Sequence, residues 1–357
     1  MRLLVSAGGT AGGVYPALAV VHALSGQADV LWIGGQGGME EQLVPRAGLR
    51  FEAIPAAGVH GVGLRALPRN LQQLTRGYRA AQRFLNDFRP EVMLLTGGYV
   101  GVPVALAGKK VRKVAYVPDL QPGLALRLIT RFADTVAVTA PEARQKYGSK
   151  RVVVTGYPTR PELRPMEKRD ARRVLGLDPD RMVLLAFGGS RGAHSINQTV
   201  WHVLPGLLDL AQVIHLTGEL DWPQVASVQA ELPERLQGRY HPHAYLHEQM
   251  GLALAAADLA VSRAGASSLG EFPLFGLPAV LIPYPHAWRY QRVNADYLAA
   301  HGAAVRMDDQ SLARDLLPEV RKLLQDPVRL ERMAEAMRGL ARPGAAQAIA
   351  AELERGA

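Results

Sequence analysis

Short hydrophobic runs alternate with longer amphipathic segments along most of the chain. In the first half the runs are Arg2–Ala7, Val30–Ile33, Val92–Leu95, Lys113–Val117, Thr135–Val138 and Arg151–Val154. Short continuous apolar runs bounded by polar segments predict buried strands, and the segments between them predict helices. This alternation is typical of an α/β fold in which a parallel sheet is covered on both faces.

The alternation lapses near residues 156–172 and then begins again. This stretch opens with G-Y-P-T-R-P-E-L-R-P, and its proline and charge predict a connection between two domains. After it, Met182–Phe187 predicts a strand, Gly188–Ala193 a glycine loop and Ile196–Leu208 a helix. The chain begins in the same order, with a glycine loop at Gly8–Gly13. Two such units predict two Rossmann-like domains that face each other across a cleft.

The stretch Ser262–Gly276 carries the strongest chemical signal. It lies between two apolar runs, and Ala266, Ser267 and Ser268 are expected to open a helix that continues to about Phe275. The start of a helix presents unpaired N–H groups and a partial positive charge, which suits a phosphate. On the first turn of that helix or just past it, the Glu271 carboxylate could accept hydrogen bonds from a ribose diol. The alternative is an ordinary capped helix whose glutamate compensates the helix dipole.

The glycine loops differ from the dinucleotide-binding fingerprint. The first has G-G-x-x-G-G spacing, and the second predicted strand ends on I-G-G-Q, without the acidic residue that would hold an NAD ribose. Loops of this kind either cradle a diphosphate with backbone N–H groups or allow a helix to pack tightly on a strand. Residues 188–192 also fit G-x-S-x-G, the nucleophile elbow of hydrolases, but the equivalent first loop carries Thr10, which favours phosphate binding.

Composition and charge indicate a globular protein without disulfides that binds an anionic partner. The chain has 357 residues, 48% of them hydrophobic and 20% charged, which is typical of a globular protein with more than one domain. It has no cysteine, which rules out disulfides and thiolate metal sites. The histidines at 241, 243 and 247 lack a carboxylate to complete a metal site, so we expect no metal. The net charge of +9 predicts an anionic partner, such as phospholipid headgroups or a phosphorylated substrate.

The segment Leu64–Phe88 predicts a basic amphipathic helix. Its apolar positions, spaced by three and four residues, are Leu64, Leu67, Leu71, Leu74 and Tyr78, and its basic stripe is Arg65, Arg69, Arg76, Arg79 and Arg83. A helix of this kind can lie on an anionic membrane surface. The alternative is a helix packed on the core with a solvated arginine face.

Taken together, these motifs resemble the MurG family of glycosyltransferases in peptidoglycan synthesis, nearly from end to end. The motifs are G-G-T-A-G-G-V-Y-P, T-G-G-Y-V-G-V-P, G-G-S-R-G-A-H-S-I-N-Q, S-R-A-G-A-S-S-L-G-E and R-Y-Q-R-V-N-A. The resemblance implies a GT-B fold with an acceptor and membrane domain at 1–157 and a UDP-sugar donor domain at 158–340. Residues 341–357 would form a C-terminal helix that packs back on the first domain. It also implies metal-independent transfer of N-acetylglucosamine from UDP-GlcNAc to lipid I, giving lipid II, at the cytoplasmic face of the cell membrane.

The resemblance also implies roles for individual residues. The donor-binding set would be Arg160, Ser190, Arg191, Gly192, His247, Ala266, Ser267, Ser268, Glu271, Tyr290 and Gln291. The set that binds the acceptor diphosphate would be Gly9, Thr10, Ala11, Gly12, Gly13, Gly97, Gly98 and Tyr99. The membrane patch would be the apolar and basic stripes of Leu64–Arg83. A nucleic-acid partner is not expected.

Two departures from the family pattern fall on the acceptor and catalytic side. The first loop of the family normally ends in histidine, where this chain has Gly13, and the family's H-E-Q-N is replaced by Tyr116-Val-Pro-Asp119. Asp119, at the end of a predicted strand, is then the best candidate for the general base. Tyr116 is a second and weaker candidate, since an unperturbed phenol is protonated at neutral pH. Two alternatives stay open: a transferase with another lipid or metabolite acceptor, and a UDP-sugar-binding protein without catalysis.

Overall fold

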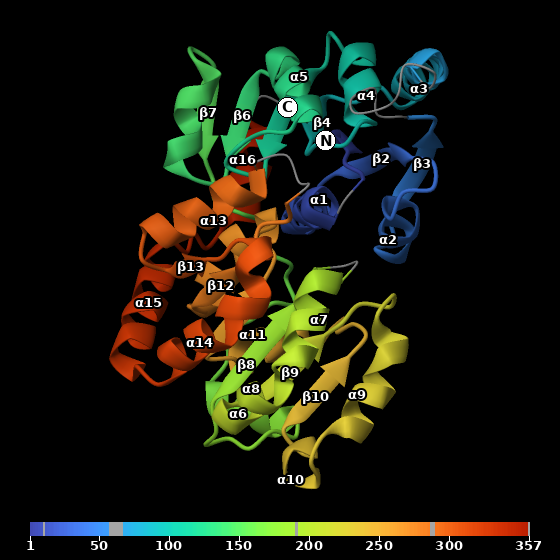
Figure 1. Cartoon of the computed structure of the whole chain (residues 1–357). Coiled ribbons are helices and arrows are strands. Elements are labelled where there is room, and N and C mark those ends of the chain that lie inside the picture. The colour runs from blue at the N-terminus through green and yellow to red at the C-terminus, as the bar shows by residue number, and fades with distance from the viewer. Residues whose placement is uncertain (10, 57–66, 190–191, 286–289, 356–357) are drawn as a thin grey trace. The chain divides into compact units, whose positions relative to one another are not determined.

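The computed structural model describes residues 1–9, 11–56, 67–189, 192–285 and 290–355 (Figure 1). The chain divides into two compact units. Unit 1 comprises Met1–Arg160 together with Pro343–Ala357, and unit 2 comprises Pro161–Arg342. Each unit is built around its own parallel sheet, so the α/β fold class predicted from the alternation of strands and helices is confirmed.

The sheet of unit 1 has seven parallel strands in the order β3-β2-β1-β4-β5-β6-β7. The strands are β1 (Arg2–Ser6), β2 (Asp29–Gly35), β3 (Arg50–Ile54), β4 (Val92–Leu95), β5 (Arg112–Val117), β6 (Thr135–Val138) and β7 (Arg151–Val154). Strand β1 pairs with both β2 and β4, so the strand order reverses between β1 and β4. Ligands of open parallel sheets bind beyond the carboxyl ends of the strands at such a reversal.

Helices cover both faces of this sheet. They are α1 (Ala11–Ala23), α2 (Glu40–Arg46), α3 (Leu67–Phe88), α4 (Gly101–Ala107), α5 (Leu124–Phe132) and α16 (Ala345–Glu354), with a 3₁₀ segment at Pro141–Tyr147. Because right-handed crossovers that run in opposite directions place their helices on opposite faces, α4 and α5 lie opposite α1. Helix α3 packs on α4, and α4 packs on α5 (Figure 1).

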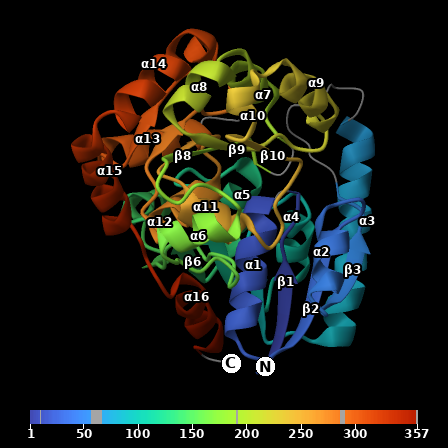
Figure 2. The ribbon, with the colours of Figure 1, turned by 90° about the horizontal axis from the view of Figure 1, so that it is seen from below.

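The C-terminal helix α16 belongs to unit 1, although it follows the whole of unit 2 in sequence. It packs against α1, and Figure 2 shows the two helices side by side. Arg112 donates a hydrogen bond to the Leu353 carbonyl, and Arg151 forms an ion pair with Glu352 at 2.8 Å. These contacts fasten the end of the chain to strands β5 and β7.

The sheet of unit 2 has six parallel strands in the order β10-β9-β8-β11-β12-β13. They are β8 (Val183–Phe187), β9 (Gln212–Leu216), β10 (Tyr240–His243), β11 (Leu259–Ser262), β12 (Ala279–Leu281) and β13 (Ala304–Arg306). The helices are α6 (Lys168–Val174), α7 (His194–His202), α8 (Leu204–Leu210), α9 (Val225–Glu231), α10 (Glu234–Gln237), α11 (Met250–Ala256), α12 (Glu271–Phe275), α13 (Tyr290–Ala300), α14 (Leu312–Leu324) and α15 (Pro327–Gly339).

Two helices predicted from the sequence differ in the structure. The helix expected over 196–208 is two helices, α7 and α8, and Pro205 lies in the first turn of the second. The helix expected from Ala266 to about Phe275 is a 3₁₀ turn, Ala266–Leu269, followed by the short helix α12. Proline explains the second break as well, because Pro273 in one continuous helix would clash with the Leu269 carbonyl. Glu271 is therefore the first residue of α12.

None of the described helices is both long enough and apolar enough to cross a membrane.

Candidate functional site

Two glycine-rich loops meet at the carboxyl edge of the unit 1 sheet. The first glycine loop (residues 8–13) follows β1, and the second (residues 97–99) follows the neighbouring strand β4. Gly98 has a φ of +81°, and a Cβ atom on it would lie 2.6 Å from the Gly8 carbonyl oxygen. Only glycine fits such a backbone contact, so the two loops form one continuous surface of main-chain atoms.

The first glycine loop runs directly into a helix. Helix α1 begins at Ala11, so Gly12 and Gly13 lie in its first turn, inside the segment that was predicted to be a loop. The Thr96 hydroxyl donates a 2.7 Å hydrogen bond to the Gly13 carbonyl and ties α1 to the end of β4. N–H groups of a first helical turn have no partner within the helix and are available to an anion. Thr10 lies outside the described residues.

A buried carboxylate that the sequence analysis did not single out supports the first glycine loop. Glu40, at the start of α2, is 1% exposed, and its side chain accepts hydrogen bonds from the N–H groups of Gly9 (3.3 Å) and Gly35 (3.0 Å). A Cβ atom on Gly8 would lie 2.2 Å from the Glu40 carboxylate. Burying a charge is costly unless it is hydrogen-bonded, so this contact fixes the loop backbone from behind. The only sequence signal was an acidic pair in the glycine-rich turn G-G-M-E-E-Q.

The two candidates for the general base are placed very differently. Asp119 is half-buried just beyond the end of β5, next to the strand that carries the second glycine loop. Tyr116 has no exposed surface, and its hydroxyl is 2.9 Å from the Thr139 hydroxyl and donates to the Gly156 carbonyl. Burial raises the pKa of the Tyr116 phenol well above its usual value of 10. The candidate role of Tyr116 as a base is therefore corrected: it is a core residue, because a buried neutral phenol cannot take a proton from a substrate.

Arg160 and Tyr99 also belong to unit 1. The Arg160 guanidinium lies over the ring of Tyr15 in α1, 5.0 Å from the ring centroid, a distance at which a cation is attracted to an aromatic face. Tyr99 is 48% exposed at the end of the second glycine loop. Both side chains are therefore held at or near the carboxyl edge of the unit 1 sheet.

The third glycine loop (residues 188–193) joins β8 to α7 in unit 2. A Cβ atom on Gly188 would lie 2.2 Å from the Ala193 nitrogen, and one on Gly192 would lie 2.4 Å from the Thr217 carbonyl oxygen. Gly192 also has a φ of +74°. The loop therefore packs main chain against main chain, as the first two glycine loops do. Ser190 and Arg191 lie outside the described residues.

A buried polar network holds α7 behind the third glycine loop. The Tyr240 hydroxyl accepts from Trp201 and lies 3.1 Å from His215 Nδ1, while His215 Nε2 lies 3.0 Å from the Asn197 amide oxygen. Asn197 donates in turn to Asp221 at 2.7 Å. Since the Asn197 oxygen needs a donor, His215 carries its proton on Nε2 and accepts from Tyr240 on Nδ1. Burial lowers the pKa of His215 to about 3, so the ring is neutral and the network is complete.

The segment after β11 provides a second surface of main-chain groups. The Ser268 hydroxyl is buried and donates to the Gly265 carbonyl at 2.6 Å, whereas Ser267 is half-buried. A Cβ atom on Gly265 would meet nothing within 4 Å, so the backbone there is open to a ligand. Glu271 is half-buried at the start of α12. The buried Asn294 of α13 donates to the Ala264 carbonyl and fixes the start of the segment.

Arg263, which the sequence analysis did not assign, links three elements at the same edge of unit 2. It follows β11 directly and donates to the Ser195 hydroxyl in the first turn of α7 at 2.8 Å. It also forms an ion pair with Asp309, after β13, and lies over the Tyr284 ring. The signal in the sequence was its place in the motif S-R-A-G-A-S-S-L-G-E, directly after a buried strand.

The remaining predicted donor residues are Tyr290 and Gln291, at the start of α13, and His247, after β10. The Gln291 side-chain oxygen accepts from the Tyr284 N–H at 2.9 Å, and Tyr290 begins α13. His247 is exposed after β10 and contacts the ring of Tyr245, with 4.6 Å between the ring centroids. Among the residues that the structure describes, no three histidine, aspartate or glutamate side chains gather closely enough to hold a metal ion.

Comparison with known proteins identifies relatives along the whole chain. The model of the glycosyltransferase family 28 N-terminal domain matches residues 3–138, and that of the C-terminal domain matches residues 183–349. A relative from Roseiflexus sp. is 42% identical over 99% of this chain and 94% of its own length. A relative from Desulforudis audaxviator is 37% identical, with coverage of 99% and 98%. Both are named UDP-N-acetylglucosamine–N-acetylmuramyl-(pentapeptide) pyrophosphoryl-undecaprenol N-acetylglucosamine transferase.

Solved structures agree with the sequence comparison. The crystal structure of Acinetobacter baumannii MurG matches with a TM-score of 0.78 at 26% identity, covering 99% of both chains. The calicheamicin glycosyltransferase CalG4 matches with a TM-score of 0.70 at 17% identity, over 100% and 99% of the two chains, and supports the fold alone. The predicted GT-B fold class is confirmed by these matches.

The buried state of His215 predicts a pH dependence of stability. In the unfolded chain a histidine titrates near pH 6.5, whereas in the folded chain the pKa of His215 is about 3. The unfolded state therefore binds the proton first as the pH falls. The stability that comes from burying the neutral ring is fully present above about pH 6.5 and is lost between there and about pH 3. We expect the free energy of unfolding to fall by up to about 1.4 kcal/mol per pH unit more steeply in the wild type than in His215→Gln.

Urea titrations at about pH 7, 6 and 5 would measure the two slopes. His202→Gln, at the exposed end of α7, serves as the control and should keep the slope of the wild type. Equal slopes in the wild type and His215→Gln would show that the ring is not held neutral in the fold.

Proposed function

The chain belongs to glycosyltransferase family 28, and we propose that it transfers N-acetylglucosamine from UDP-GlcNAc to lipid I, the undecaprenyl-diphosphate-linked N-acetylmuramyl-pentapeptide, to form lipid II. The observation that carries the proposal is the 42% identity, over 99% of the chain, to a transferase whose name states that donor and that acceptor. The MurG crystal structure that matches both units supports it. Peptidoglycan synthesis is the process to which this reaction belongs.

The reaction is a direct displacement with inversion. The acceptor hydroxyl attacks the anomeric carbon of the sugar, the bond from that carbon to the UDP oxygen breaks, and the hydroxyl proton passes to a base. Negative charge develops on the departing UDP. Main-chain N–H groups and helix starts aimed at that charge stabilise it without a metal, because they are oriented before the reaction begins. The third glycine loop and the Ala266–Leu269 turn offer such groups in unit 2.

We assign the UDP moiety to unit 2 and the acceptor diphosphate to the first and second glycine loops of unit 1. In unit 2, the open backbone at Gly265 and the carboxylate of Glu271 both follow strand β11 and are six residues apart. A carboxylate beside an open turn can accept hydrogen bonds from a ribose diol while the turn holds phosphate oxygens.

Two departures from the family pattern fall on the acceptor side. Gly13 offers only main-chain atoms where the family has histidine, and Tyr116 is buried in the core. A transferase with a different lipid or metabolite acceptor is the second candidate. Release of UDP from UDP-GlcNAc with a lipid I analogue tests the proposal. Release only with another acceptor would favour the second candidate, and UDP binding without any turnover would favour a binding protein.

Glu271→Ala tests the donor site. Loss of the carboxylate should weaken UDP binding by about 1.5–3 kcal/mol, the range for hydrogen bonds to a charged partner. Isothermal titration calorimetry with UDP measures the change. Glu234→Ala, an exposed glutamate at the start of α10, removes the same charge and should bind UDP as the wild type does. A folded Glu271→Ala protein with unchanged UDP affinity would show that the Glu271 carboxylate does not bind the ribose.

Asp119→Asn tests the general base. A positioned base contributes roughly 10²–10⁴-fold to a proton transfer, and asparagine keeps the shape of aspartate without its basicity. We expect turnover with the lipid I analogue to fall at least about tenfold, while UDP affinity and the melting temperature stay close to those of the wild type. The alternative role, capping the helix that follows, would be nearly preserved by asparagine. Near-normal turnover would therefore reject Asp119 as the base.

We further propose that unit 1 docks on the cytoplasmic face of the membrane through α3 and its neighbours. Arg69, Arg76, Arg79 and Arg83 are all exposed on α3, as is Leu71, whereas Leu74 and Tyr78 are half-buried. The large hydrophobic side chains exposed among the described residues of unit 1 are Leu71, Tyr99, Leu106, Leu124, Leu128 and Phe132. All of them lie on α3, α4 and α5 or at the entry to α4. Leu64 and Arg65 lie outside the described residues, and the Leu67 side chain is not described.

Replacing Arg69, Arg76 and Arg79 with glutamine tests this docking. The affinity for anionic liposomes should fall by about 1 kcal/mol per charge removed, and the loss should shrink as salt is added. Liposome flotation at low and high salt measures it. The matched control replaces the exposed Arg321, Arg332 and Arg342 of unit 2 and removes the same total charge. If the two triple variants bind anionic liposomes equally, α3 is a packed helix with a solvated arginine face and not the docking surface.

A further inference from the structure

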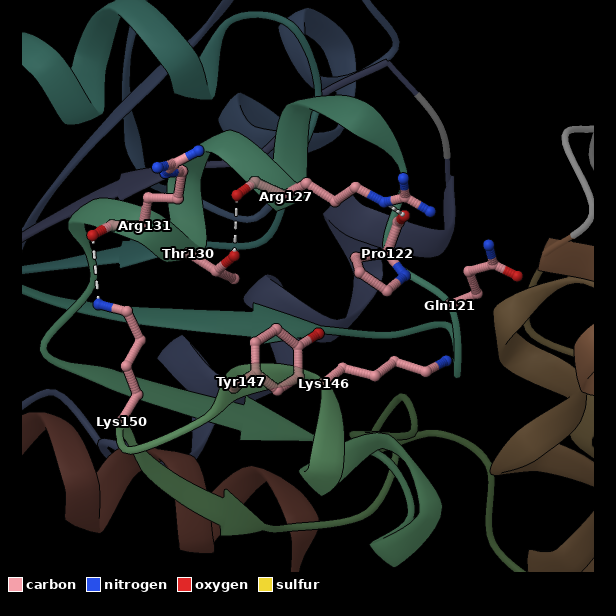
Figure 3. Close-up of a pocket in the computed structure, with 8 residues that line it drawn as sticks. All are labelled: Gln121, Pro122, Arg127, Thr130, Arg131, Lys146, Tyr147 and Lys150. Carbon is pink, nitrogen blue, oxygen red and sulfur yellow. Dashed lines mark hydrogen bonds between the residues drawn. The ribbon is translucent and has the colours of Figure 1, made fainter.

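Unit 1 contains a basic cavity that lies beside, and not within, the glycine loops. It has a volume of about 690 Å³ and lies between α5 and the segment that runs from the Pro141–Tyr147 3₁₀ turn into β7 (Figure 3). Four of its lining residues are basic: Arg127, Arg131, Lys146 and Lys150. The transfer reaction assigns no role to any of them.

Arg127 and Lys146 reach the same loop from opposite walls of this cavity. Arg127 Nε donates to the Pro122 carbonyl at 3.1 Å, and Lys146 Nζ donates to the Leu120 carbonyl at 2.5 Å. Each contact uses one donor, which leaves several N–H groups on the guanidinium and the ammonium. Among the described residues, neither forms an ion pair with a carboxylate. Burial, and then the charge of Arg127, lower the pKa of Lys146, as expected for two cations without a counter-ion.

Tyr147 adds a hydroxyl to the lining of the same cavity. Its oxygen is buried and has no hydrogen-bond partner, and Figure 3 shows it directed toward the side of the cavity where Arg127 and Lys146 extend. Burial raises the pKa of the phenol to about 12, so it is a proton donor at neutral pH. A buried polar atom without a partner costs free energy unless a ligand satisfies it.

Lys150 and Arg131 have other roles. Lys150 donates to the carbonyls of Arg131 (3.2 Å) and Ala133 (2.9 Å), and so caps the end of α5. The guanidinium of Arg131 points away from Tyr147 in Figure 3. The groups that converge on the cavity are therefore Arg127, Lys146 and the Tyr147 hydroxyl.

An exposed apolar stripe borders the cavity. Leu124, Leu128 and Phe132 are each about 40% exposed (38%, 40% and 39%) and lie four residues apart on α5. At 3.6 residues per turn, Arg127 lies about 60° around the helix from Leu124, between the stripe and the buried Thr130 on the cavity wall. Arg127 thus lies between the basic cavity and an exposed apolar surface, which is the arrangement that an amphipathic anion requires.

We propose that Arg127, Lys146 and the Tyr147 hydroxyl bind the phosphate of an anionic lipid headgroup, whose acyl chains lie along Leu124, Leu128 and Phe132. Two cations and a neutral donor match the several oxygens and the negative charge of a phosphate ester, and the guanidinium fork can bind two of those oxygens at once. The adjoining stripe favours a lipid over a soluble phosphate. The inference rests on the proposed membrane docking and is independent of the sugar transfer.

Vesicle binding by three single variants of the full chain tests the site. The probe is phosphatidylcholine vesicles with and without phosphatidylglycerol, and the variants are Tyr147→Phe, Arg127→Gln and Arg144→Gln. Arg144 lies on the same 3₁₀ segment but does not line the cavity. We expect Arg127→Gln to lose about tenfold or more in affinity for the anionic vesicles, and Arg144→Gln to lose no more than the roughly fivefold that one surface charge supplies.

Tyr147→Phe is the sharpest variant because it changes no charge. In a phosphate-free buffer without lipid, the melting temperature of Tyr147→Phe should equal or exceed that of the wild type, since the substitution removes a buried hydroxyl without a partner. Its affinity for the anionic vesicles should nevertheless fall by about three- to tenfold. Binding equal to the wild type in both Tyr147→Phe and Arg127→Gln would overturn the proposal, because docking would then depend on diffuse charge alone.

Competition with soluble phosphates tests whether the cavity prefers a lipid headgroup to a free anion. Glycerol 3-phosphate and inorganic phosphate should compete with the vesicles only weakly, at millimolar concentration, because they lack the acyl chains. If they raise the melting temperature of the wild type but not of Tyr147→Phe, while vesicle binding is the same in both, the cavity takes a soluble anion and the lipid assignment is wrong. UDP titrations on the same proteins report on unit 2, so a failed donor site would be distinguished from a failed lipid site.

Discussion

Direct packing of main chain on main chain at the carboxyl edges of the two sheets is the constraint on which the remaining structure depends. In unit 1, Gly98 lies so close to the Gly8 carbonyl that no side chain fits between them, and in unit 2 Gly192 approaches the Thr217 carbonyl in the same way. Such contacts leave N–H groups at the surface instead of side chains. A diphosphate needs many donors at short range, and exposed main chain at the start of a helix supplies them.

Each unit supports these thin loops with buried polar side chains, though of different kinds. Behind the first glycine loop stands a carboxylate, Glu40, which receives hydrogen bonds from Gly9 and Gly35. Behind the third glycine loop stands a network in which His215 stays neutral between Asn197 and Tyr240. In both arrangements the buried polar groups have hydrogen-bond partners, and such satisfied groups are rigid. They therefore hold the glycine-rich backbone in one conformation, although glycine by itself allows many.

The positive charge of unit 1 is arranged in two different ways. On α3 the arginines are exposed and form a stripe beside Leu71, a surface suited to a diffuse layer of negative charge. In the cavity beside α5, Arg127 and Lys146 converge on one buried hydroxyl, which suits a single anionic group. The two surfaces lie on the helices α3 and α5, which both pack against α4. One unit thereby combines long-range attraction with a defined pocket.

Local patterns in the sequence determined the fold class and six of the seven strands of unit 1, whereas β3 (Arg50–Ile54) was not predicted. Strands β4, β6 and β7 begin and end at the residues predicted, since a strand buried on both faces is a continuous apolar run whose ends need no further information. Glycine motifs likewise marked the loops that carry the proposed chemistry. Tertiary structure alone decided which side chains those loops meet. Tyr116 lies in the core rather than in the site, where its hydroxyl donates to the Gly156 carbonyl and contacts the Thr139 hydroxyl. The cavity of Arg127 and Lys146 forms only when the segment after β6 and helix α5 bring together residues about twenty positions apart. Contacts between distant residues leave no periodic trace in the chain, so no local pattern could have predicted them.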